Sequence, residues 1–186
     1  MYRSGADLGE FDWYRWEDLR FPAQAINPVG MPGPASSTPE GLLNFDGFVD
    51  NAIAGFAQMP HGWREGSIVK PHMHLLVATS NPGTNSRWKF EYNRGNVNGA
   101  FDAVLGSYST LATITIANPA DVDLHVVADF GDISMAGFKA SAGIMWKISR
   151  LANSDAADND DSAWSLLEFD IHYQVQKTGT VAEYPS

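Results

Sequence analysis

Residues 168–176 read Glu-Phe-Asp-Ile-His-Tyr-Gln-Val-Gln, and this stretch decides the fold. Apolar and polar residues alternate along it without a break. Successive side chains of a β-strand point to opposite faces, so this alternation predicts a half-buried strand. The residues predicted to face the core are Phe169, Ile171, Tyr173 and Val175.

A second stretch, residues 87–93, reads Arg-Trp-Lys-Phe-Glu-Tyr-Asn and alternates in the same way. Trp88, Phe90 and Tyr92 therefore share one face of a strand. Three aligned rings could form a platform on which sugars or bases stack. The strict alternation with charged and polar residues instead predicts that the rings face the core.

Most of the remaining chain consists of short apolar runs separated by turn signals such as Asp46-Gly47 and Asn81-Pro82-Gly83. The expected strands cover residues 42–45, 52–59, 72–79, 109–117, 124–130 and 141–151. No segment between them resembles a long crossover helix, which favours antiparallel pairing. The sequence therefore predicts an all-β protein, an antiparallel β-sandwich of the jelly-roll type with an extended N-terminal arm.

The chain divides by composition into three parts: an aromatic arm (1–26), a Pro/Gly-rich linker (27–40) and a β-sandwich domain (41–186). Residues 27–39 contain four prolines and two glycines. Proline removes a backbone donor and fixes φ, so this segment can form neither a helix nor a central strand. We expect an extended connector there.

The arm carries large apolar side chains that need cover from water. Trp13, Trp16 and Leu19 recur at a spacing of three residues, which is compatible with a short helical turn. Together with Phe21 they are the residues expected to make the arm's contacts. Two partners are open for them, the chain's own domain or a neighbouring subunit.

Charge and composition exclude several classes of function. The formal net charge is −10 with only 12 Lys plus Arg residues, which argues against a nucleic-acid surface. The chain has no cysteine, so disulfides and thiolate chemistry are excluded. No apolar run has the length of a membrane-spanning helix, and the first residues lack the apolar core of a signal peptide. We therefore expect neither nucleic acid nor membrane as a partner.

His72 and His74 are the best candidates for metal ligands, because side chains two residues apart on a strand share a face. Gly66, five residues and His-x-His also match the first half of the metal signature of cupins. The rest of that signature is missing, since residues 75–80 contain no carboxylate. His125 and His172 could converge with the pair in the fold. The expectation is nevertheless a polar or inter-subunit face on which the imidazoles form hydrogen bonds, with no bound metal or cofactor.

Two other kinds of site are not predicted by the sequence. The acidic run 153–161 resembles a calcium loop only in its charge, since it lacks the glycine and terminal glutamate of an EF-hand, and we expect a solvated turn. Nucleophile elbows and phosphate-binding loops are both absent from the sequence. Nothing in the chain therefore predicts an enzyme.

Seven short motifs, in order along the chain, resemble a family of small structural proteins of tailed phages and prophages. They are Trp16–Pro22, Gly41–Phe45, Gln58–Gly66, Lys70–His74, Trp88–Tyr92, Phe130–Met135 and Leu167–Tyr173. The residue after the second histidine is usually aromatic in that family and is Leu75 here.

The resemblance implies a virion structural protein of the accessory, decoration or collar type, with no enzymatic role. Such a protein would be made in the host cytoplasm and would reside in the virion. Its expected partners are copies of itself, as a trimer, and other virion proteins of the capsid, portal vertex or tail. The resemblance supplies no functional residues.

Two alternatives of other classes stay open. One is a cupin-like metal-dependent enzyme that uses His72 and His74. The other is a glycan- or receptor-binding module, in which a surface aromatic such as Trp63 or Trp164 would control binding.

Overall fold

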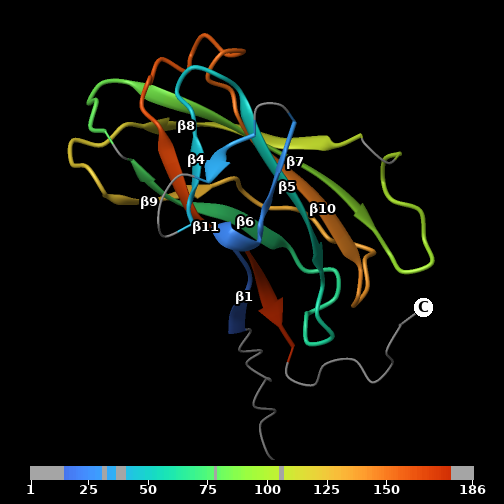
Figure 1. Cartoon of the computed structure of the whole chain (residues 1–186). Coiled ribbons are helices and arrows are strands. Elements are labelled where there is room, and N and C mark those ends of the chain that lie inside the picture. The colour runs from blue at the N-terminus through green and yellow to red at the C-terminus, as the bar shows by residue number, and fades with distance from the viewer. Residues whose placement is uncertain (1–14, 31–32, 37–40, 78, 105–106, 177–186) are drawn as a thin grey trace, which may run out of the picture.

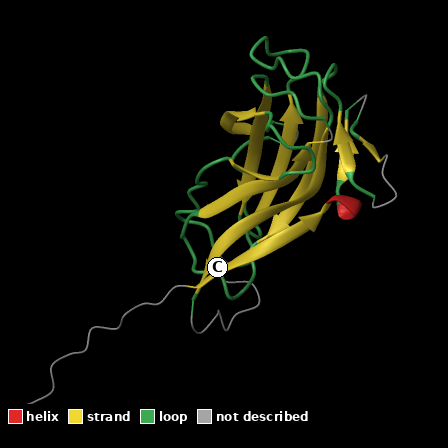
Figure 2. Ribbon diagram, turned by 90° about the vertical axis from the view of Figure 1, so that its left-hand side faces the viewer, coloured by secondary structure: helices red, strands yellow, loops and turns green. Residues whose placement is uncertain are grey.

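The computed structural model describes residues 15–30, 33–36, 41–77, 79–104 and 107–176. Figure 2 shows that this part of the chain is strand and loop, apart from one helical turn at Ala23–Ala25. The eleven strands within these ranges all pair antiparallel. No helix within these ranges is long and apolar enough to cross a bilayer. The predicted all-β antiparallel sandwich is confirmed.

The strands form two sheets. Sheet A contains β1 (Arg15–Pro22), β3 (Ala35–Ser36), β4 (Leu43–Phe45), β6 (Val69–Val77), β9 (His125–Asp129) and β11 (Trp164–Val175). Sheet B contains β2 (Asn27–Val29), β5 (Asn51–Gln58), β7 (Asn85–Gly95), β8 (Ser109–Ala117) and β10 (Gly143–Arg150).

Strand β11 is the centre of sheet A. It pairs with β6 on one side, and on the other side with β4 and then with β1. Strand β9 pairs with the far side of β6 and is an edge of the sheet within the described chain. The order in sheet B is β2-β5-β10-β7-β8.

Both alternating stretches behave as predicted. In β11, Phe169, Ile171 and Tyr173 are buried and Val175 packs against the core. In β7, Trp88 and Phe90 are fully buried. The rings of β7 therefore belong to the core and form no exposed stacking platform.

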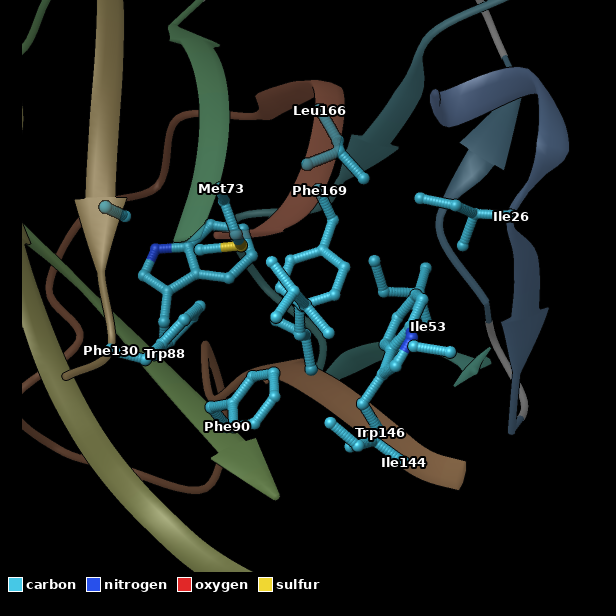
Figure 3. Close-up of a cluster of buried hydrophobic side chains, with 14 of the residues drawn as sticks. Ile26, Ile53, Met73, Trp88, Phe90, Phe130, Ile144, Trp146, Leu166 and Phe169 are labelled. Carbon is cyan, nitrogen blue, oxygen red and sulfur yellow. The ribbon is translucent and has the colours of Figure 1, made fainter. Parts of the chain in front are cut away.

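The core lies between the sheets, and aromatic rings pack in it beside aliphatic side chains (Figure 3). Phe169 of sheet A has its ring centroid 4.5 Å from Trp146 and 5.8 Å from Phe90, both of sheet B. Phe45 packs edge-on to Trp88 with the centroids 4.8 Å apart. These contacts across the two sheets fix the distance between them.

The N-terminal segment corrects one expectation. Residues 15–22 form a strand instead of a helical turn, and β1 pairs with β11 from Arg15↔Val175 to Pro22↔Glu168. Figure 1 shows the blue β1 beside the red β11. The ring of Phe21 lies 5.5 Å from Trp146 and 5.8 Å from Phe169. The sandwich therefore includes residues 15–22, which lie well before the expected boundary at residue 41.

The expected linker also contributes two short strands. β2 pairs with β5, and β3 pairs with β4, each at the edge of its sheet. Pro28 sits in β2, where an edge position tolerates the missing backbone donor. Proline excludes a central strand here, as predicted, but not an edge strand.

The acidic run 153–161 is not a freely solvated turn. The Arg150 guanidinium is fully buried, binds Asp158 at 3.2 Å and donates to the carbonyls of Phe45, Asp160 and Ser162. Asp160 is buried as well and accepts hydrogen bonds from Trp164 at 2.7 Å and from Ser162. The loop's acidic residues are thus used to anchor it to the sandwich.

Candidate functional site

The outer face of sheet A gathers most of the chain's histidines. Met73, Phe169 and Ile171 point into the core, so their neighbours on β6 and β11 point outward. The pairing places His72 opposite Asp170, and His74 opposite Glu168. We use the name histidine–carboxylate cluster for His72, His74, His125, Glu168, Asp170 and His172.

Asp170 is the centre of this cluster. Its Oδ1 lies 2.5 Å from Nε2 of His72, and its Oδ2 lies 3.3 Å from Nε2 of His74. The residue is only 3% exposed, and Oδ1 is buried without a hydrogen bond of normal geometry. One carboxylate therefore bridges two imidazoles while one of its oxygens lacks a well-aligned donor.

Two more imidazoles extend the cluster on either side. Nδ1 of His74 is 2.7 Å from Nε2 of His125, so one of these nitrogens donates and the other accepts. The rings of His72 and His172 lie 4.1 Å apart, edge to face. Nε2 of His172 is 3.0 Å from Oδ1 of Asp18 on β1. Strands β6, β9 and β11 supply the cluster, and β1 places Asp18 beside it.

The pKa values of the two central histidines, His72 and His74, shift in opposite directions. Burial opposes protonation of His72, but the Asp170 carboxylate outweighs it and raises the pKa above its ordinary value. Burial is the main cause that lowers the pKa of His74, and the nearby rings of His72 and His125 add to it against the pull of Asp170. His72 is therefore the better partner for the buried carboxylate as a cation, and His74 favours the neutral form.

Ion pairs border the cluster. Arg20 donates to both oxygens of Glu168, at 2.7 and 2.8 Å. Lys70 pairs with Asp132 at 3.1 Å, and its Nζ lies 5.7 Å from the centre of the Trp16 ring. These contacts hold the surrounding side chains in place.

The donor set suits a transition metal. His72, Asp170 and His172 have ligand atoms within 4.8 Å of one another, and so do His74, Glu168 and Asp170. Imidazole nitrogens with carboxylate oxygens are typical ligands of zinc and its neighbours. Calcium would instead require a site built from oxygen ligands.

The structure brings together part of what the sequence predicted. His72 and His74 share a strand face as expected, and His125 and His172 do converge with them. Asp170 and Glu168 were not predicted, because a carboxylate ligand was expected only in residues 75–80, directly after His74. The sequence did contain a signal for them. The alternation of residues 168–176 places Glu168, Asp170 and His172 on the face that points away from the core.

The other predicted residues lie in different places. Trp13 is outside the described residues. Leu19 and Phe21 pack against the core of their own chain, whereas Trp16 is 39% exposed on the outer face of sheet A. Of the described arm residues, Trp16 is therefore the one exposed enough to contact a neighbouring subunit.

Two aromatic candidates for glycan contact were wrong. Trp63 and Trp164 are both fully buried, so neither can stack on a ligand at the surface. The last histidine, His61, lies apart from the cluster and is 3.1 Å from the hydroxyl of Ser141.

Comparisons with known proteins give a fold but no family. No family model matches the chain, and no curated protein matches it. Among solved structures, a family 35 carbohydrate binding module from an environmental isolate superposes with a TM-score of 0.51. It is 11% identical, and the match covers 90% of this chain and 99% of the other.

Two further structures are similar at lower scores. The CBM22-1 xylan-binding domain from Paenibacillus barcinonensis is 15% identical, with a TM-score of 0.42 over 86% of this chain and 95% of that one. A structure of infectious bursal disease virus, Gt strain, is 12% identical, with a TM-score of 0.38 over 88% of this chain and 33% of that one. At these identities the likeness to the first structure establishes the sandwich architecture alone.

Proposed function

We propose that the protein is an accessory structural component of a tailed-phage virion, which assembles through protein–protein contacts and catalyses no reaction. It would be a homo-oligomer that also contacts capsid, portal-vertex or tail proteins.

The observation that carries this proposal is where the phage-like motifs lie in the fold. Trp16–Pro22, Gly41–Phe45, Lys70–His74 and Leu167–Tyr173 are far apart in sequence, yet they supply β1, β4, β6 and β11, which are neighbours in sheet A. Four of the seven motifs therefore meet in sheet A, whereas Trp88–Tyr92 lies in β7 of sheet B, and Gln58–Gly66 and Phe130–Met135 lie mainly in loops. A surface shared by such proteins would account for the four motifs that meet.

The edge of sheet A supports self-association. Strand β9 has one free side in the described chain, and exposed aliphatic side chains lie on it and on the loop before it: Val122, Leu124 and Val127. Val127 is 54% exposed and pairs in register with His74, so it stands on the same outer face. Unpaired edges with apolar side chains are sites where a second chain can pair.

Light scattering of the purified chain tests this assembly. We expect a trimer of the 20.3 kDa chain, and we expect Val127→Asp to reduce it to smaller species. The matched control is Val97→Asp, which changes an exposed valine beyond the end of β7 in sheet B. A monomeric wild-type protein would count against the proposal, and so would equal effects of the two substitutions.

Carbohydrate binding is the second candidate, and the comparisons favour it. The structure with the TM-score of 0.51 is a carbohydrate binding module. The outer face of sheet B also has a hollow of about 290 Å³ with several hydrogen-bonding groups. Its polar lining includes Asp50, Asn51, Lys89, Lys147 and Ser149. A hollow of that size could hold one or two sugar rings.

A glycan screen separates the two candidates. If the hollow binds sugar, Lys147→Ala should weaken binding while Val127→Asp leaves it unchanged. A screen without hits, together with a stable oligomer, would leave the structural role as the better account.

A further inference from the structure

We propose that His72, Asp170 and His172 bind one divalent transition-metal ion, for which zinc is the best match. This goes beyond the structural role proposed above and does not depend on it.

The backbone arranges these three side chains before any ion arrives. His72 and Asp170 are directly opposite in the β6–β11 pair, and His172 follows Asp170 by two residues on the same face. Opposed residues of antiparallel strands have Cβ atoms about 5 Å apart, which lets their ligand atoms meet. Both strands lie inside sheet A with partners on each side, so the site stands on rigid elements.

The buried carboxylate supplies an independent reason for a cation. Removing a carboxylate from water is unfavourable unless opposite charge or hydrogen bonds compensate it. Oδ1 of Asp170 is buried without a well-aligned donor, although Nε2 of His72 is only 2.5 Å away. An ion between these two groups would satisfy the oxygen and separate the crowded atoms to the spacing of two ligands of one metal.

The alternative group, His74, Glu168 and Asp170, is less free to bind. Both oxygens of Glu168 are taken by Arg20, so this carboxylate would have to give up an ion pair before it could bind a metal. In the first group, the contact that competes with metal binding is the ion pair between His172 and Asp18. The Asp18 side chain is 42% exposed, so it can turn toward water at little energetic cost.

Three protein ligands leave at least one position of a tetrahedral zinc ion open. His172 is the most exposed ligand, with 39% of its side chain accessible, so the open position faces the outer surface of the sheet. A water molecule or a group from another protein could occupy it.

The test is zinc titration of the full-length chain after treatment with a chelator, with calorimetry and elemental analysis of the same sample. We expect one zinc ion per chain. His72→Ala, Asp170→Asn and His172→Ala should each weaken binding at least about tenfold, since even loss of a group that only orients a ligand costs that much. His61→Ala is the matched histidine control and should bind like the wild type.

Two more variants fix which group holds the ion. His74→Ala and Glu168→Gln should retain zinc. Zinc should also raise the melting temperature of the wild type and of His61→Ala, but not that of His172→Ala, which separates lost binding from lost folding. The inference is overturned if the wild type binds no zinc, or if binding survives in His172→Ala but is lost in Glu168→Gln.

Discussion

The buried ion pair between Arg150 and Asp158 yields the sharpest prediction about stability. Asp158→Ala leaves the Arg150 guanidinium fully buried, with only carbonyl oxygens as partners. Breaking one side of a buried pair costs about 3–5 kcal/mol, because the remaining charge is uncompensated. The lost carboxylate also accepted the backbone N–H of Arg87 at 2.8 Å, which adds to the cost.

Urea unfolding followed by tryptophan fluorescence measures this effect. With a slope of about 2 kcal/mol per molar urea, the midpoint should fall by about 1.5–2.5 M. The control is Asp155→Ala, whose partner Arg87 is partly exposed, and a clearly smaller loss is expected because solvent screens that ion pair. The reasoning is refuted if Asp158→Ala lowers the free energy of unfolding no more than this control does.

Three further predictions concern the sandwich. Phe21→Ala should lower the free energy of unfolding by about 2 kcal/mol, because its ring packs on two buried aromatic rings; an effect near zero in urea unfolding would mean that β1 is dispensable. Gly47→Ala should lower the free energy of unfolding by about 1–3 kcal/mol, since a Cβ there would come within 2.2 Å of a backbone oxygen. The control is Gly62→Ala, whose Cβ would meet nothing nearer than 3.8 Å, and equal thermal stabilities of the two variants would contradict this. Burial alone would raise the pKa of Asp160, but hydrogen bonds, the first from Trp164, hold it below its ordinary value of 3.8. The stabilisation of the fold by ionised Asp160 is therefore complete above about pH 4 and is lost as the pH falls through the lowered pKa. The difference in stability between the wild type and Asp160→Asn should accordingly shrink on acidification.

Local alternation was enough to predict the class of fold. The side chains of residues 168–176 and 87–93 point as their period of two requires, because one face of each strand is buried against the other sheet. The sequence pattern of residues 13–21 was misleading for the opposite reason. Spacing compatible with a helical turn was overridden by pairing with β11, about 150 residues further along the chain, which no local pattern reveals.

The candidate site could be predicted only in part. His72 and His74 share a face by strand geometry alone. That Asp170 lies opposite His72 depends on the register between β6 and β11, and His125 joins only because β9 pairs with β6. Register over such separations is fixed by packing of the whole core, which is why the carboxylate at the centre was missed.

The acidic run was misjudged because its partner, Arg150, is buried, although it stands only eight residues before Asp158. Arg150 ends β10, and its burial beneath the loop turns Asp158 and Asp160 from solvated residues into structural ones. Composition predicts charge at such a place but not the buried arginine that organises it.

The measurement that tests the central claim most directly is quantitative mass spectrometry across a density gradient of phage particles from bacteria that carry this gene. A virion component should sediment with the particles, at a constant ratio to the major capsid protein in every fraction that contains them. If the protein stays with the soluble proteins at the top of the gradient while intact particles sediment without it, the structural role is contradicted.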